Sequence, residues 1–388
     1  TAALSGTPGP VHLVLPFDVL TNSSALEKMP SIHPIVSTGL SADQKNKLVD
    51  ALNEALRPIL ITGPQCNNSR QPIANTALST KLGMPIICLE SARGLADTFY
   101  GNFPEILASA DLIILMGKRG DYATGLLTPG QIASNASIIS ILTADQPTPN
   151  HDTRSIDVMR VGAIPNAMLD LAGVAPAVDA NWAAHVETMI RSRKAWTSKG
   201  ERRHPVAVAK SLQSVIDRAS QPILIADGGE FCQWIQAGCS ANARMINGPS
   251  GAIGGGICYA IGASIACPEA EVFLTIGDGT AGFYLAEFNT AVRAGSSIVT
   301  LIGNDYCWNA EAQIQIDSFG ADRLYACDLD ETANYATAAA GLGAYATTVN
   351  PHDDLDAALE LALKKDGPSC LNILIDSYPA PRFSPIKL

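Results

Sequence analysis

Short runs of continuous apolar residues alternate with helix-like stretches through most of this chain. In the first half the runs cover 58–62, 85–89, 111–116 and 137–142, and in the second half 221–226, 271–276, 297–302 and 369–375. Strands of a parallel sheet are buried on both faces and are therefore apolar throughout, whereas half-exposed strands alternate apolar and polar residues. The pattern predicts an α/β protein with two doubly wound parallel-sheet domains.

The alternation stops between residues 173 and 204, where prolines and basic residues replace the apolar runs. This range is predicted to be a connector. We expect a central Rossmann-like domain over 31–172 and a second α/β domain over 205–388. The 388 residues of the chain suit two domains of ordinary size.

Charge and composition exclude several classes of partner. The chain has 37 acidic and 26 basic residues, a formal charge of -11, and no basic cluster that would attract nucleic acid or an anionic membrane surface. No apolar stretch reaches the roughly 20 residues that span a bilayer, and the start does not resemble a signal peptide. Nine cysteines without a C-x-x-C pair suit a reducing compartment. We expect a soluble, cytoplasmic protein without nucleic-acid or membrane partners.

Polar residues follow two neighbouring strands of the second predicted sheet. Gly277-Asp278-Gly279-Thr280 comes directly after one strand, and Asn304-Asp305 comes at the end of the next. Because parallel strands place their carboxyl ends at one edge of the sheet, Asp278 can share a cation with Asn304 or Asp305. Carboxylate and amide oxygens suit Mg²⁺, and the backbone N–H groups and hydroxyl of 279–280 suit phosphate.

These two motifs together resemble the magnesium and diphosphate motif of thiamin-diphosphate enzymes. Residues 248–256 are similar to the segment that grips the aminopyrimidine ring, and 227–230 to the turn on the far side of the diphosphate. Residues 283–292 resemble the helix that follows the motif, and 7–18 the strand that ends the pyrimidine-binding domain. The 31–172 region looks like the central domain of the acetolactate synthase group. The resemblance implies that 1–30 is the tail of a pyrimidine-binding domain with a linker, and that 205–388 binds diphosphate and Mg²⁺.

The resemblance also implies roles for individual residues. Asp278, Asp305 and the backbone carbonyl of Cys307 correspond to the metal ligands. Asp305 stands where the family usually has asparagine, so Asn304 is an alternative ligand. Ile253 corresponds to the wedge that bends the cofactor, and the carbonyl of Gly251 to the group that holds its amino group; these two are the implied catalytic positions. The implied cofactor-binding residues are Gly228, Gly229, Glu230, Gly251, Ile253, Gly277, Asp278, Gly279, Thr280, Asp305 and Asn309. Cys307 and Trp308 either line the substrate cleft or pack in the core.

The implied activity is cleavage or formation of a C–C bond next to a carbonyl, with thiamin diphosphate and Mg²⁺ as cofactors. Decarboxylation of a 2-oxo acid, carboligation and 2-hydroxyacyl lyase chemistry all remain open. One alternative is a non-catalytic regulatory or scaffold subunit, which has less need of Asp278 and Asp305. Another is an FAD- or nucleotide-dependent enzyme, because the central domain binds FAD or ADP in some members of the family.

The resemblance finally implies a partner. Family members activate the cofactor with a glutamate on the pyrimidine-binding domain, which would precede Thr1. We expect a second polypeptide that carries this domain and its activating glutamate, in a homo- or hetero-oligomer with an even number of subunits that acts on a small carbonyl substrate. Three origins of Thr1 stay open: self-cleavage of a longer precursor, a separate gene, and an arbitrary end of the sequence.

Overall fold

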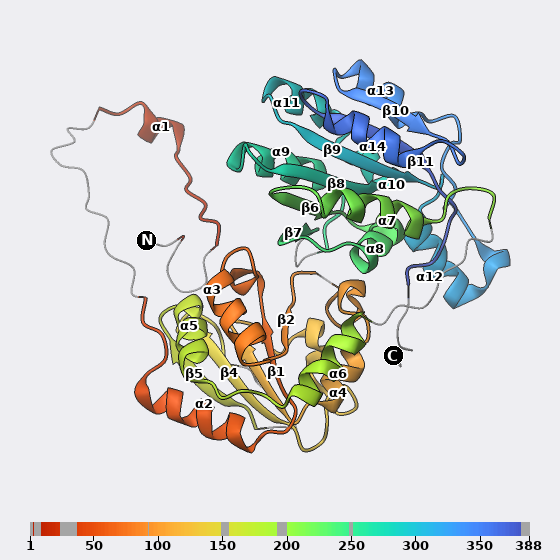
Figure 1. Cartoon of the computed structure of the whole chain (residues 1–388). Helices are drawn as coiled ribbons and strands as arrows, with labels where there is room; N and C mark the ends of the chain where they lie inside the picture. Colours follow the sequence, from red (N-terminus) through yellow and green to blue (C-terminus); the bar gives the residue numbers. More distant parts are fainter. Residues whose placement is uncertain are drawn as a thin grey trace. The chain divides into compact units, whose positions relative to one another are not determined.

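The computed structural model describes residues 3, 9–23, 37–91, 93–148, 155–191, 200–247 and 251–381. Within it the chain forms two compact units. The first contains Thr1–Leu89, Leu107–Asp121 and Gly125–His185, and the second contains Glu90–Ile106, Tyr122–Thr124 and Val186–Leu388. Each unit is built on an all-parallel sheet, which confirms the predicted fold class (Figure 1).

The first unit contains a five-stranded sheet in the order β2-β1-β3-β4-β5. The strands are β1 (Pro58–Thr62), β2 (Ile86–Cys88), β3 (Leu112–Met116), β4 (Ser137–Thr143) and β5 (Asp157–Val161). Every residue of β1 and β3 is buried, because both faces of these central strands are covered. The helices of this part of the chain are α2 (Ala42–Glu54), α3 (Pro72–Thr76), α4 (Phe103–Ser109), α5 (Ile164–Val174) and α6 (Ala180–Arg191).

The second unit contains a six-stranded sheet in the order β10-β11-β9-β8-β6-β7. The strands are β6 (Pro222–Ala226), β7 (Ala243–Ile246), β8 (Glu271–Gly277), β9 (Ile298–Asn304), β10 (Tyr345–Val349) and β11 (Ser369–Leu374). The helices are α7 (Pro205–Ile216), α8 (Gly229–Gly238), α9 (Gly256–Ala266), α10 (Asp278–Tyr284), α11 (Glu287–Arg293), α12 (Asn309–Phe319), α13 (Tyr335–Gly341) and α14 (Leu355–Leu363).

Helices cover both faces of this second sheet. Phe273 of β8 joins a core formed with α7, α8 and α14, whereas its neighbour Leu274 joins a separate core formed with α9, α11 and α13. Successive side chains of a strand point to opposite faces, so two cores on adjacent residues require a layer of helices on each side. The carboxyl ends of β8 and β9 lie next to each other, because Gly277 pairs with Gly303.

The predicted strands correspond to β1–β4, β6, β8, β9 and β11. Three strands were not predicted, and all three lie at a sheet edge: β5, β7 and β10. The predicted helix over 283–292 is instead the end of α10 and a separate helix α11. The predicted connector contains α6. Predictions for residues 248–250 and for most of 1–8 lie outside the described residues.

A segment from the first half of the sequence, 90–106, packs within the second unit. Arg244 of β7 forms an ion pair with Glu90 at 3.0 Å, and both side chains are less than 10 % exposed. The guanidinium also lies 3.7 Å from the ring centroid of Phe99, and the Thr98 hydroxyl donates to the Gln233 carbonyl at 2.7 Å. Charge, ring stacking and a hydrogen bond therefore fix this segment to β7 and α8.

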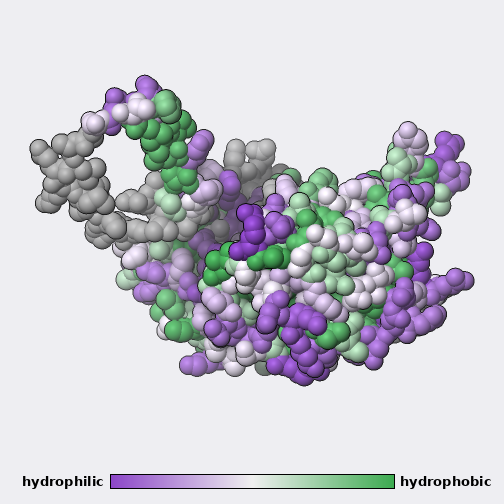
Figure 2. Space-filling view, turned by 90° about the horizontal axis from the view of Figure 1, so that it is seen from above, coloured by the Kyte–Doolittle hydropathy of each residue, from purple (hydrophilic) through white to green (hydrophobic). Residues whose placement is uncertain are grey.

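The chain near the N-terminus was expected to include a strand over 7–18. Its described part, residues 9–16, forms neither helix nor strand, and α1 (Phe17–Leu20) is a single turn. A strand needs a neighbour to satisfy its backbone groups, and the described residues pair no strand with this segment. Its apolar side chains are exposed, among them Leu13 and Phe17 (Figure 2). None of the helices in the described ranges is long and apolar enough to cross a membrane.

Candidate active site

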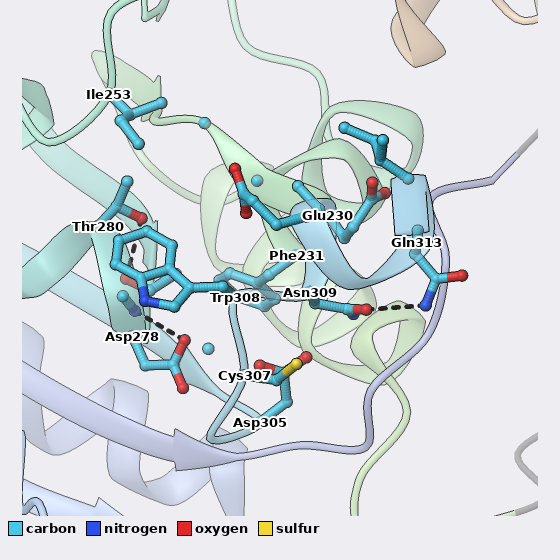
Figure 3. A pocket seen from close by; sticks show the side chains of 18 of the residues that line it. Glu230, Phe231, Ile253, Asp278, Thr280, Asp305, Cys307, Trp308, Asn309 and Gln313 are labelled. Atoms are coloured by element: carbon cyan, nitrogen blue, oxygen red, sulfur yellow. Dashed lines mark hydrogen bonds between the residues drawn. The ribbon is translucent and has the colours of Figure 1, made fainter. Parts of the chain in front are cut away.

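A cavity of about 400 Å³ opens at the carboxyl edge of the six-stranded sheet. Its lining includes the twelve residues that the family resemblance implies as catalytic, cofactor-binding or metal-binding: Gly228, Gly229, Glu230, Gly251, Ile253, Gly277, Asp278, Gly279, Thr280, Asp305, Cys307 and Asn309. Ten further residues complete the lining: Arg93, Phe231, Asn247, Gly303, Trp308, Ala310, Glu311, Gln313, Ile314 and Asp317. The structure thus brings the predicted residues together, while their individual roles stay predictions (Figure 3).

Asp278 is the most buried carboxylate of this cavity, with 2 % of its surface exposed. Its Oδ1 accepts the N–H of Gly279 at 2.8 Å, whereas Oδ2 has no hydrogen-bond partner among the described residues. Burial and the nearby charge of Asp305 raise the pKa of Asp278 to about 7. A buried carboxylate oxygen without a partner is costly, so the site calls for a cation.

Asp305 provides the second carboxylate. Its Oδ2 accepts a hydrogen bond from the Ser377 hydroxyl at 2.9 Å. Burial raises the pKa of Asp305 to about 6, although hydrogen bonds from Ser377 and from the N–H of Cys307 act in the other direction. Asp278 and Asp305 therefore face one cavity from two adjacent strand ends and disfavour each other's ionisation.

Asn304, the alternative metal ligand, uses both ends of its amide inside the protein. Its Nδ2 donates to Oδ1 of Asn372 at 3.1 Å, and its Oδ1 accepts the N–H of Tyr306 at 3.1 Å. The side chain is completely buried and does not line the cavity. This arrangement favours Asp305 over Asn304 as the residue that faces a cation.

The donor set of the cavity suits Mg²⁺. No group of three or more His, Cys, Asp or Glu side chains in the described ranges is arranged to hold a metal ion. Burial and nearby acidic groups raise the pKa of the Cys307 thiol to about 12, so its sulfur is not an anionic ligand. Two carboxylates and backbone carbonyls remain. Mg²⁺ commonly takes one or two carboxylates and completes its shell with phosphate oxygens and water.

The loop after β7 is held by Asp227, at the end of β6. Its carboxylate accepts the N–H groups of Gly254 at 2.9 Å and Gly256 at 2.8 Å. Gly254 has a φ of +91°, a conformation that favours glycine. The same loop carries Ile253, whose side chain lies against Gly228: a Cβ on Gly228 would come 2.3 Å from Cγ2 of Ile253. The missing side chain at 228 therefore makes room for Ile253.

The sequence left open whether Trp308 lines the substrate cleft or packs in the core. In the structure it lines the cavity. A Cβ added to Gly279 would lie 2.8 Å from the indole ring, so the ring rests directly on the glycine backbone. The ring of Phe283 meets the indole edge-on at 6.0 Å. In the view of Figure 3 the indole separates Ile253 from Asp278.

The chain after β11 is hydrogen-bonded to residues that line the cavity. Beyond the bond from Ser377, the carbonyl of Tyr378 accepts the amide of Asn309 at 3.0 Å, and the N–H of Ala380 donates to Glu230 at 2.6 Å. Asn309 also accepts a hydrogen bond from Gln313 at 2.9 Å. Glu230 and Asn309, both predicted cofactor-binding residues, therefore also anchor the segment after β11.

Comparison with known proteins identifies the class of domain that contains this cavity. Residues 227–373 match the thiamine pyrophosphate enzyme C-terminal TPP-binding domain. Twelve of the predicted site residues, and the ends of β8 and β9, lie inside the matched range. The second unit therefore contains a C-terminal TPP-binding domain of the thiamine pyrophosphate enzyme type, as the sequence motifs had indicated.

Curated relatives show which thiamine pyrophosphate enzymes this chain is similar to, at low sequence identity. The chain is 29 % identical to human 2-hydroxyacyl-CoA lyase 2 over 88 % of its own length and 62 % of the relative's. It is 24 % identical to the acetolactate synthase large subunit IlvG of Mycobacterium tuberculosis, over 97 % of its own length and 71 % of that protein. The chain thus spans about 62 % of the length of the lyase.

A solved structure supports the fold. It comes from Mycobacterium smegmatis and is assigned as a thiamin diphosphate-dependent enzyme; the TM-score is 0.66 at 18 % identity, over 92 % of this chain and 68 % of that one. At this identity the match concerns the fold alone.

Proposed function

We propose that this chain is the cofactor-binding part of a thiamin-diphosphate- and Mg²⁺-dependent enzyme that breaks or forms a C–C bond next to a carbonyl. The pair Asp278 and Asp305 carries the proposal. Both carboxylates line one cavity, burial raises the pKa of each, and the charge of Asp305 raises the pKa of Asp278 further, so a bound cation would stabilise their ionised forms. A purely structural scaffold gains nothing from retaining such a pair.

Asp278 and Asp305 would hold Mg²⁺, with the backbone carbonyl of Cys307 as a third ligand. Bound thiamin diphosphate supplies the carbon nucleophile and the electron sink of the reaction. The protein supplies orientation. Gly277, Gly279 and Thr280 line the cavity next to Asp278, where the diphosphate would lie. The N–H of Gly279 donates to Asp278 and the Thr280 hydroxyl donates to the Gly277 carbonyl, so these bonds would hold the turn that faces the diphosphate.

Ile253 would set the shape of the bound cofactor. Its side chain is 37 % exposed and lines the cavity, while its Cγ2 packs against Gly228. Asp227 accepts the N–H groups of Gly254 and Gly256, which follow Ile253 in the loop, and these bonds restrain the position of Ile253. The carbonyl of Gly251, two residues away on the same loop, would accept a hydrogen bond from the amino group of the cofactor.

Arg93 suggests an anionic substrate. It is the one cationic side chain among the described residues that line the cavity, which also contains Glu230, Glu311 and Asp317. The carboxylate of a 2-oxo acid and the phosphates of a coenzyme A thioester are negative groups that a guanidinium can bind. We expect Arg93→Gln to raise KM for such a substrate by about 10-fold with a smaller change in kcat, measured by steady-state kinetics. An unchanged KM would exclude Arg93 from substrate binding.

The activating glutamate would come from a pyrimidine-binding domain that docks beside this unit. The proposal is supported by exposed apolar side chains on residues 11–20 and on the helices next to the cavity, such as Tyr259 and Phe283. Such surfaces are usually covered by a partner. Native mass spectrometry of the active complex should show this domain in an assembly with an even number of subunits.

Calorimetric titration tests the cofactor assignment. Thiamin diphosphate should bind the purified protein in the presence of Mg²⁺ and bind much more weakly in EDTA. Equal binding in both conditions would contradict the metal site. Incubation of the loaded complex with a 2-oxo acid and, separately, with a 2-hydroxyacyl thioester then separates an enzyme from a scaffold, because only an enzyme consumes one of them. Cofactor binding without turnover in the complete complex would favour the scaffold.

A further inference from the structure

We propose that Asn372 is a positioning residue for the metal-binding turn. The inference rests on the proposed function and concerns a residue of β11 that does not line the cavity. Asn372 would act through Asn304, which holds the backbone from which Asp305 and Cys307 face the cavity.

The residues form a continuous chain of hydrogen bonds across three neighbouring strands. Nδ2 of Asn372 donates to the hydroxyl of Thr348 on β10 at 3.5 Å, and its Oδ1 accepts from Nδ2 of Asn304 on β9 at 3.1 Å. Oδ1 of Asn304 then accepts the N–H of Tyr306 at 3.1 Å. Asn304 and Asn372 are 0 % and 2 % exposed, so water does not compete for these bonds.

The turn that these bonds support has an unusual backbone. Tyr306 has a φ of +58°, which is unfavourable for a residue with a side chain. It lies between Asp305 and Cys307, so any relaxation of Tyr306 moves both proposed metal ligands. The hydrogen bond from the N–H of Tyr306 to Asn304 holds this conformation in place.

Asn372 determines which end of the Asn304 amide faces the turn. An amide can rotate by 180° and exchange its donor and acceptor ends. Because Oδ1 of Asn372 accepts only from Nδ2 of Asn304, the oxygen of Asn304 points toward the N–H of Tyr306. Burying the polar amides of Asn304 and Asn372 inside the sheet costs free energy. A role in holding the metal ligands would explain why these two residues are polar.

The test replaces Asn372, so that the amide of Asn304 is no longer oriented, and measures the affinity for Mg²⁺. Asn372→Leu keeps a similar volume and loses both hydrogen bonds. At saturating thiamin diphosphate, calorimetric titration should show affinity for Mg²⁺ reduced on the order of 10-fold, the effect typical of groups that hold a metal ligand in place. Asn372→Asp retains an acceptor for Asn304 and should recover most of that affinity. If Asn372→Leu does not fold, Asn372→Ala provides the same test without added bulk.

Ser369→Ala is the matched control. Ser369 lies on the same strand, is fully buried, and donates to the carbonyl of Ala362 at 3.0 Å. The control should lose thermal stability and keep its Mg²⁺ affinity. Unchanged Mg²⁺ affinity in a folded Asn372→Leu variant, or an equal loss in Ser369→Ala, would overturn the inference. Failure of the wild-type protein to bind Mg²⁺ with thiamin diphosphate would instead overturn the proposed function.

Discussion

The two parallel sheets differ most at the carboxyl ends of their strands. In the five-stranded sheet, neighbouring side chains satisfy the backbone groups of Thr143 at the end of β4. Oε1 of Gln146 accepts the N–H of Thr143 at 3.0 Å, and Arg160 donates to the Thr143 carbonyl at 2.7 Å. Gln65 fills the space above Gly117, where a Cβ would meet Nε2 at 2.5 Å. In the six-stranded sheet, Asp278 keeps an oxygen without a partner among the described residues.

The same architecture thus serves two purposes. Ligands of parallel sheets bind beyond the carboxyl ends of the strands, but the fold alone does not decide which sheet is used. The decisive difference is the charge of the strand-end groups. In the first sheet the strand-end group without a partner among the described residues is the neutral hydroxyl of Thr62, at the end of β1, whereas in the second sheet it is a carboxylate oxygen whose negative charge a bound cation can neutralise.

The strongest test removes this charge. Asp278→Ala should reduce the affinity for Mg²⁺ with thiamin diphosphate by more than about 100-fold and abolish activity, because it deletes a metal ligand. The fold should persist, since Asp278 lines the cavity and the hydrogen bond of its Oδ1 is a local one, to the N–H of the adjacent Gly279. Calorimetric titration measures the loss, and unchanged affinity would exclude Asp278 as a ligand.

A second test of the Asp278 carboxylate compares the thermal stability of the Asp278→Asn variant with that of wild type. Burial and the charge of Asp305 raise the pKa of Asp278 to about 7 from the ordinary value of 3.8, so ionisation destabilises the metal-free fold as the pH rises through this range. The metal-free Asp278→Asn variant should therefore melt at a higher temperature than wild type at pH 8, with the difference shrinking toward pH 4. A lower melting temperature at pH 8 would mean that the carboxylate stabilises the fold.

The second carboxylate should have a graded effect. Asp305→Ala should lower Mg²⁺ affinity by about 100-fold and Asp305→Asn by about 10-fold, because an amide oxygen can still coordinate the ion. The two variants are compared in the same titration. Equal losses would point to Asn304 as the ligand.

Ile253→Ala should affect turnover more than binding. Removing the wedge should lower kcat on the order of 10-fold, since the ring geometry of the cofactor is less restrained. The dissociation constant of thiamin diphosphate should change less than about 3-fold, because the diphosphate and metal provide most of the binding. A loss confined to the dissociation constant would make Ile253 a packing residue.

The smallest effects are expected at the first sheet. Gln146→Leu should leave the affinity for Mg²⁺ and thiamin diphosphate unchanged, and saturating FAD or ADP should not raise the melting temperature, because the strand ends there are occupied by their own side chains. Thermal melts and an absorption spectrum measure both. Flavin absorbance, or a clear rise in melting temperature, would give the first sheet a ligand of its own.

Most of the strands that could be predicted from the sequence are buried and largely apolar. Central strands such as β1 and β3 are buried along their whole length, and their residues are apolar except for Thr62 at the end of β1. The missed strands β5, β7 and β10 lie at edges and mix buried with half-exposed positions, as in Tyr345–Val349. An edge strand has one neighbour, so its sequence is less constrained and short alternating segments are hard to distinguish from loops.

The candidate site could be predicted where its residues follow strands within motifs. Asp278 and Asp305 lie at two adjacent strand ends, and the order of a parallel sheet brings them together. Arg93 and Asn372 could not be found this way. Arg93 reaches the cavity from a segment more than 200 residues before Asp305, and Asn372 acts from inside β11 through a hydrogen bond that no sequence spacing encodes.

The attachment of 90–106 to the second unit limits how this protein can be dissected. A minimal fragment that begins at residue 205 would contain every strand of the six-stranded sheet, yet it would lose Glu90 and the aromatic ring of Phe99 from the surroundings of Arg244. An arginine left in an apolar recess without its carboxylate destabilises the structure around it. Excision of the cofactor-binding fold should therefore succeed only when 90–106 is supplied as well, as a fused or separately added peptide.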